Sequence, residues 1–173
     1  MAEASAIPVL FSAEEIATRV QELARDIAAL PKRPDIAMPI LVGGFVFAAD
    51  LVRALAREGV PLDIEMLWLR SYGDKRVASA ISMIAGPSEQ IAGRHVLVID
   101  GVLDAGRTIK KAASLIEAAG AASVRVVVML DKRQPGAVAK ADHVGFEIGN
   151  DFVIGYGMDD AGRYRTLPYI GKV

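Results

Sequence analysis

Two uninterrupted apolar runs, with a helical segment between them, constrain the fold more than any other feature of this sequence. Residues 96–99 and 124–130 are mainly β-branched residues and leucine, which is typical of strands buried on both faces of a sheet. Residues 108–119 have helical spacing, and Gly120 follows as a favourable helix end. A strand, a helix and a second strand with short connections form a βαβ unit, whose two strands are parallel. The sequence therefore predicts an α/β fold with an at least partly parallel sheet.

Further candidate helices and strands lie upstream of this unit. Ser12 and Glu15 form a capping box, which predicts the start of a helix, and Pro31 marks its end. The other predicted elements are strands at residues 36–42, 62–68 and 80–85 and a helix at residues 45–58. The chain has 173 residues, of which 53% are hydrophobic, so we expect a single domain spanning residues 1–173.

The composition narrows the classes of partner. The formal net charge is −1 without a long run of one sign, which gives no reason to expect nucleic-acid or membrane binding. The absence of cysteine excludes disulfides and thiolate metal sites. Residues 1–5 lack the pattern of a signal peptide, and no apolar run approaches the ~20 residues that span a bilayer. We therefore expect a cytoplasmic protein.

Residues 100–108 follow the first apolar strand directly and combine two carboxylates with a glycine and a threonine. Ligands of parallel sheets bind beyond the carboxyl ends of the strands. Gly106 has no Cβ, so a phosphate can approach the backbone, where unpaired helical N–H groups and the Thr108 hydroxyl can bind it. Asp100 and Asp104 would repel a phosphate unless a cation or sugar hydroxyls lay between them, which favours a phosphorylated sugar chelated by magnesium. Alternatively, neither carboxylate binds a ligand: Asp104 is a negative charge that interacts favourably with the dipole at the start of the helix, and Asp100 is a turn residue.

The pattern Asp-x-x-x-Asp-x-Gly-x-Thr at residues 100–108 resembles the phosphoribosyl-pyrophosphate signature of the type I phosphoribosyltransferases. Other segments, in the same order along the chain, are similar to hypoxanthine-guanine phosphoribosyltransferases. These segments are residues 43–51, 71–73, 141–148, 152–159 and 163–171. The resemblance implies a mostly parallel twisted sheet flanked by helices, with a small hood formed by the terminal segments.

The resemblance also implies a reaction, in which a 6-oxopurine displaces pyrophosphate from phosphoribosyl-pyrophosphate. The expected acceptor is hypoxanthine or guanine, the product is a nucleoside monophosphate, and the cofactor is Mg²⁺. Enzymes of this type are commonly homodimers or homotetramers, so a homo-oligomer is expected. Such a reaction depends mostly on positioning, on neutralising the charge of pyrophosphate and on removing the purine proton.

Residue roles follow from the matching positions in the family pattern. Asp104 matches the catalytic acid near purine N7, which is assigned as the general base, and Asp100 matches the acid that holds the ribose hydroxyls and is a possible metal ligand. Lys132 matches the lysine that donates to the purine 6-oxo group. Asp159 matches a magnesium ligand in the purine-binding region, and Arg165 matches an arginine that contacts pyrophosphate.

The remaining roles concern the base, the phosphates and a covering loop. Phe152 matches the aromatic residue that stacks on the purine, and Val153 matches the residue whose backbone contacts the purine edge. The predicted phosphate-binding residues are Ala105, Gly106, Arg107 and Thr108; the pyrophosphate loop has Val42 and Gly43; and Ser71 and Tyr72 start the mobile loop. The family has a non-proline cis peptide in the pyrophosphate loop, which predicts one between Leu41 and Val42.

The sequence departs from the family pattern mainly on the phosphoribosyl-pyrophosphate side. Gly101 stands in place of the second acid, Ala105 in place of a threonine and Val42 in place of a frequent lysine. The stretch between Tyr72 and Ile81 is short for the mobile loop. Three hypotheses remain open: an enzyme with an altered ribose clamp, a non-catalytic or regulatory nucleotide-binding protein, and an enzyme for xanthine or another base.

Overall fold

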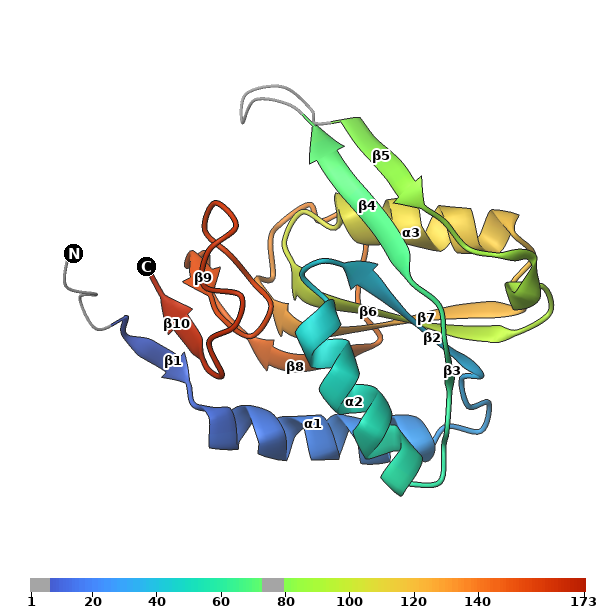
Figure 1. Cartoon of the computed structure of the whole chain (residues 1–173), viewed down its shortest axis with the longest axis horizontal. Helices are drawn as coiled ribbons and strands as arrows, with labels where there is room; N and C mark the ends of the chain where they lie inside the picture. The colour runs from blue at the N-terminus through green and yellow to red at the C-terminus, as the bar shows by residue number, and fades with distance from the viewer. Residues whose placement is uncertain (1–6, 73–79) are drawn as a thin grey trace.

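The computed structural model describes residues 7–72 and 80–173 (Figure 1). Its elements are β1 (Val9–Phe11), α1 (Ala13–Ala28), β2 (Ile36–Leu41), α2 (Phe45–Arg57), β3 (Asp63–Ile64), β4 (Leu67–Tyr72), β5 (Ala80–Ala85), η1 (Glu89–Ile91), β6 (His95–Leu103), α3 (Arg107–Ala118), β7 (Ser123–Asp131), β8 (His143–Glu147), β9 (Val153–Ile154) and β10 (Ile170–Lys172). Ser71 and Tyr72 end β4; their side chains, and residues 73–79 of the expected mobile loop, lie outside the described residues.

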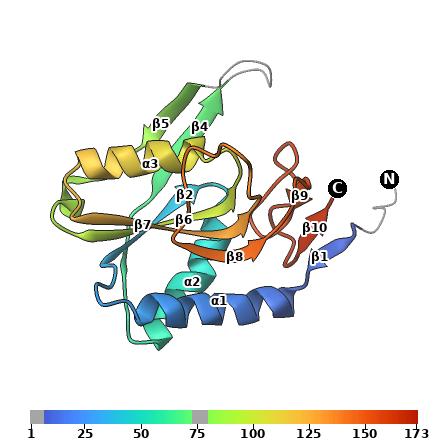
Figure 2. The same ribbon diagram turned by 180° about the vertical axis from the view of Figure 1, so that it is seen from behind.

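A mostly parallel sheet forms the centre of the protein, as the βαβ pattern predicts. Its strand order is β5-β4-β2-β6-β7-β8, and β3 also pairs with β2. The pairs β2–β4, β2–β6, β6–β7 and β7–β8 are parallel, whereas β5 returns antiparallel to β4. Figures 1 and 2 show α3 on one face of this sheet and α1 and α2 on the other.

Each face of the sheet has its own apolar core, and β6 contributes to both. Leu97 and Ile99 pack in the core beneath α1 and α2, where Phe47 is fully buried. Val96 and Val98 belong to the core beneath α3. Since successive side chains of a strand point to opposite faces, the uninterrupted apolar run of β6 follows from burial on both sides.

A small three-stranded sheet with the order β1-β10-β9 joins the two ends of the described chain (Figure 1). Both strand pairs are antiparallel. The rings of Phe11 and Phe146 stack with centroids 4.0 Å apart, which packs this sheet against β8. The predicted hood of terminal segments is therefore confirmed.

Two local predictions differ from the structure. The expected strand at residues 62–68 is divided into β3 and β4. Pro39 explains the division: Ala37 accepts a hydrogen bond from the Glu65 N–H, and the next donor on that side of β2 would be the N–H that Pro39 lacks. The strand expected at residues 96–99 continues to Leu103, because Val102 and Leu103 still pair with β7; Asp100 therefore lies in β6 and not in a loop.

Among residues 7–72 and 80–173, no helix combines the length and apolar character needed to cross a bilayer.

His143, at the start of β8, links stability to pH. Its buried Nε2 has no hydrogen-bond partner among the described residues, and burial lowers the pKa of the imidazole. The unfolded chain therefore binds this proton more tightly, so the contribution to stability is constant above the ordinary pKa of 6.5 and falls as the pH drops below it. For His143→Leu, we expect a smaller change in the free energy of unfolding between about pH 8 and about pH 5, measured by urea denaturation. Identical changes in both proteins would contradict this.

Candidate active site

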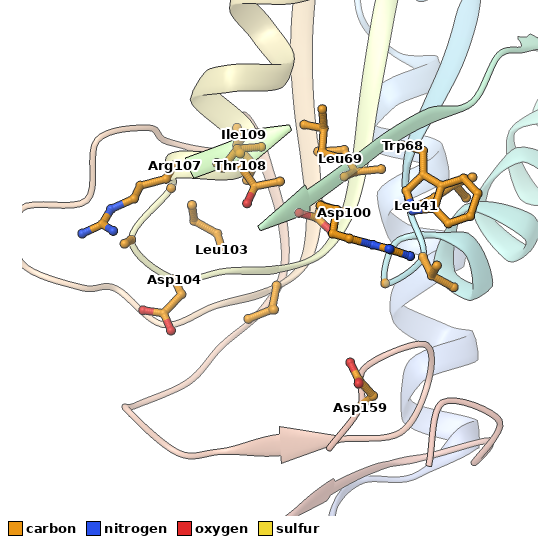
Figure 3. Close-up of a pocket in the computed structure, with 18 of the residues that line it drawn as sticks. Leu41, Trp68, Leu69, Asp100, Leu103, Asp104, Arg107, Thr108, Ile109 and Asp159 are labelled. Carbon is orange, nitrogen blue, oxygen red and sulfur yellow. The ribbon is translucent and has the colours of Figure 1, made fainter. Parts of the chain in front are cut away.

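A cavity of about 870 Å³ opens beyond the carboxyl ends of β2 and β6, the usual position of ligand sites in parallel sheets. Figure 3 shows Leu41 and Trp68 on one wall and Asp104 and Arg107 at the opposite end. The residues predicted for the site that line this cavity are Val42, Gly43, Asp100, Asp104, Ala105, Gly106, Arg107, Thr108, Asp159 and Arg165. The structure thus brings together segments that are far apart in the sequence.

The turn between β6 and α3 depends on Gly106. This residue has a φ of +77°, and a Cβ on it would lie 2.8 Å from the backbone nitrogen of Ala139. Glycine is thus required by conformation and packing, in addition to the phosphate approach expected from the sequence. The helix begins at Arg107, where the first N–H groups have no acceptor within the helix. Arg107 directs its side chain away from the other labelled residues in Figure 3.

Asp100 is a partly buried carboxyl group of β6 that lies beside the pyrophosphate loop. Its Oδ1 accepts a hydrogen bond of 2.8 Å from the Gly101 N–H. Burial raises the pKa of Asp100 to about 7, although the bond from Gly101 opposes this shift. Desolvation therefore dominates at this carboxyl group.

Gly101, where the signature has a second acid, packs closely against the pyrophosphate loop. A Cβ at Gly101 would lie 3.1 Å from the carbonyl oxygen of Gly43. A Cβ at Gly157 would collide with the same oxygen. The Gly43 carbonyl is thus enclosed by the backbones of β6 and of the segment after β9. The sequence indicated only a lost carboxylate here, whereas the structure also gives Gly101 a packing role.

The segment after β9 contributes an ion pair to the cavity. Asp159 Oδ1 lies 2.6 Å from Arg165 Nη2, and Asp159 Oδ2 accepts a hydrogen bond from the Gly162 N–H. Arg165 also donates through Nη1 to the carbonyl of Gly157 at 2.6 Å. Both side chains are therefore held in place before any ligand binds.

A second ion pair connects the ends of β6 and β7. Lys132 Nζ lies 3.2 Å from Asp104 Oδ2. The Lys132 side chain is only 12% exposed, whereas that of Asp104 is 54% exposed. The Lys132 N–H donates to the Leu103 carbonyl, which fixes the backbone beside the pair. A ligand in the cavity would therefore meet the Asp104 carboxylate, which has the Lys132 ammonium group directly beside it.

Three predicted purine-binding residues, Lys132, Phe152 and Val153, are not among the residues that line the cavity. Phe152 is 50% exposed just before β9, and Val153 is buried in β9 opposite Lys172. Their contact with a purine stays a prediction. The sequence did not identify Trp68, Leu69, Arg70 and Ile81, which also line the cavity. They lie on β4 and β5, and local spacing does not reveal that β4 is the neighbour of β2.

The peptide bond between Leu41 and Val42 is cis, as predicted. A family model for the phosphoribosyl transferase domain matches residues 10–161. The hypoxanthine-guanine phosphoribosyltransferase of Bacillus subtilis is 36% identical over 166 residues, which cover 94% of this chain and 91% of that protein. The chain belongs to the hypoxanthine-guanine phosphoribosyltransferase family.

Other members of this phosphoribosyltransferase family agree in sequence and structure. The hypoxanthine phosphoribosyltransferase of Haemophilus influenzae is 34% identical, covering 96% of this chain and 95% of that protein. A Trypanosoma cruzi hypoxanthine phosphoribosyltransferase in complex with the product IMP superposes with a TM-score of 0.86 at 34% identity, covering 100% and 97% of the two chains. The bifunctional TilS/HprT protein of Listeria innocua is 38% identical, and the chain spans about a quarter of its length.

The raised pKa of Asp100 predicts a pH dependence of stability. Since the folded protein binds this proton more tightly than the unfolded chain, the contribution is fully present below the ordinary pKa of 3.8 and is lost as the pH rises through about 7. Asn cannot ionise, so Asp100→Asn should lose less stability than the wild type between about pH 5 and about pH 8. Urea denaturation across this range measures the effect, and parallel curves for the two proteins would refute it.

Proposed function

We propose that this phosphoribosyltransferase acts in purine salvage by transferring the 5-phosphoribosyl group of phosphoribosyl-pyrophosphate to hypoxanthine or guanine, with release of pyrophosphate. The observation that carries the proposal is one cavity lined by Asp104, which pairs with Lys132, by the start of α3 and by the Asp159–Arg165 pair. The Bacillus subtilis relative carries the name of this activity, and the Trypanosoma cruzi relative binds IMP. A single domain, a homo-oligomer and a cytoplasmic location remain part of the proposal.

The sugar and its phosphates occupy the cavity between β2 and α3 in this proposal. The 5-phosphate accepts hydrogen bonds from the free N–H groups at residues 105–108 and from the Thr108 hydroxyl. Asp100 accepts from the ribose hydroxyls, without the second acid that Gly101 replaces. Pyrophosphate lies at Val42 and Gly43. Arg165 is within reach of it there, because a Cβ placed on Gly43 would be only 3.9 Å from Arg165 Nη1.

The purine lies beside Asp104 and Lys132. An ammonium group donates only, so Lys132 favours the 6-oxo acceptor of hypoxanthine and guanine and disfavours the 6-amino donor of adenine. Asp104 accepts the proton at N7 as N9 attacks the anomeric carbon of the ribose. Phe152 and Val153 complete the pocket by stacking and by backbone contact. A second candidate, an enzyme for xanthine, follows from the fact that Lys132 does not select the 2-substituent.

Magnesium fits the carboxylates of this cavity as a hard cation with oxygen ligands. Among the described residues no three His, Cys, Asp or Glu side chains converge to hold a metal alone. Asp159, with Asp100 as a second carboxylate, would therefore hold the ion together with oxygens of the substrate, which is the usual arrangement for Mg²⁺. When bound, the ion neutralises charge on the departing pyrophosphate.

The protein's own groups perform the remaining steps. The start of α3 and the pyrophosphate loop hold the two ends of the substrate, which aligns the bond that breaks with the attacking purine nitrogen. Asp104 removes the purine proton, and Lys132 stabilises both the 6-oxo group and the Asp104 carboxylate. Arg165 stabilises the negative charge that develops on the departing pyrophosphate.

A steady-state assay with phosphoribosyl-pyrophosphate, Mg²⁺ and one base at a time tests this function. We expect turnover with hypoxanthine and guanine and none with adenine. Turnover of xanthine would broaden the substrate class. Binding of IMP without turnover of any base would reject the enzyme and support a non-catalytic nucleotide-binding protein.

The role of Asp104 is tested by Asp104→Asn, which keeps the size of the side chain but cannot accept the proton. We expect a fall in kcat of at least about 100-fold, while the Kd for IMP changes by less than about 10-fold. Asp63→Asn is the matched control, because Asp63 lies on β3, pairs with Arg94 and is not among the residues that line the cavity. A wild-type kcat in Asp104→Asn would remove its assignment as the base.

A further inference from the structure

Arg70 on β4 is a cavity-lining cation to which the sequence pattern gives no role. Among the described residues, the cations that line the cavity are Arg70, Arg107 and Arg165. Arg165 already pairs with Asp159, and Arg107 points away from the other labelled side chains (Figure 3). In the described part of the chain, no carboxylate forms an ion pair with Arg70. No carboxylate of the described residues therefore competes with a ligand for the charge of Arg70.

The position of Arg70 is set by the pairing of β4 with β2. Leu41 lies opposite Trp68 in the parallel register, and Arg70 is two residues further along, on the same face of β4. The cis bond after Leu41 leads into Val42 and Gly43, which border the same cavity. Val42 is 44% exposed and carries no charge, so the loop itself offers backbone groups but no cation.

Trp68 holds the guanidinium group of Arg70 near this loop. The Arg70 Cζ lies 5.8 Å from the centroid of the Trp68 ring, within the range of a cation–π interaction. A guanidinium group held over an aromatic ring loses less freedom when it binds an anion, and its planar set of donors matches phosphate oxygens. A multiply charged ligand at Val42 and Gly43 would therefore meet an oriented cation from β4.

We propose that Arg70, oriented by Trp68, binds the pyrophosphate group and supplies the positive charge that Val42 does not. The inference rests on the proposed function, which places pyrophosphate at residues 42–43. It assigns the β4 wall of the cavity to the leaving group. The purine is held elsewhere, at the Asp104–Lys132 pair.

The chain offers a direct readout, because Trp68 is its only tryptophan. Titration of the wild type with magnesium pyrophosphate should change the Trp68 emission as the guanidinium moves toward the phosphate oxygens. Arg70→Gln should raise the midpoint of this titration, and the KM for phosphoribosyl-pyrophosphate, by about 10-fold, with the KM for hypoxanthine unchanged. Arg70→Lys should lie between the two, because it keeps the charge but loses the planar fork.

Arg57→Gln is the matched control, since it removes the same charge from an exposed arginine at the far end of α2. It should leave the midpoint and both KM values at the wild-type level. The inference is overturned if Arg70→Gln behaves like Arg57→Gln. It is also overturned if Arg70→Gln raises the KM for both substrates equally or lowers the melting temperature, because Arg70 would then support the fold. A wild type that turns over no base would instead reject the proposed function.

Discussion

The parallel pairing of β6 with β7 is the interaction on which the site depends. It runs from His95 opposite Ser123 to Leu103 opposite Asp131, so it continues beyond the point where β2 has ended. The next residue of each strand is Asp104 and Lys132, and their ion pair is therefore a cross-strand neighbour contact just outside the sheet. One backbone register thus positions both the proposed proton acceptor and the side chain proposed to recognise the 6-oxo position.

A second constraint acts at the other end of the cavity, where three backbones meet at the carbonyl oxygen of Gly43. Gly101 and Gly157 approach this oxygen so closely that neither position has free space for a Cβ. The same contact joins the pyrophosphate loop to the hood, because Gly157 also accepts the hydrogen bond from Arg165. Gly101, where the family signature has an acid, therefore allows closer packing of the loop that precedes α2.

The sequence predicts the βαβ unit and most of the cavity because their signals are local. Buried parallel strands are continuous apolar runs, and the carboxyl ends of such strands meet at one edge of the sheet. The hood strands contain two or three residues each, too few for any periodic pattern. Trp68 and Arg70 were missed because their place in the cavity depends on the pairing of β4 with β2. The division between β3 and β4 arises from Pro39 on a different strand, so the spacing within residues 62–68 does not contain it.

The distribution of charge favours a site for a leaving group over a site that only stores a nucleoside monophosphate. In the proposed function a nucleoside monophosphate occupies the anion site at the start of α3, but it has no pyrophosphate group for Arg165 and the loop at Val42. In the free protein Arg165 and Asp159 neutralise each other at 2.6 Å. In the proposed function their separation would leave Arg165 for phosphate oxygens and Asp159 for magnesium, so each side chain would exchange one partner of opposite charge for another. Such an exchange limits the cost of desolvated charge during both binding and release, which an enzyme requires in every turnover and a storage site does not.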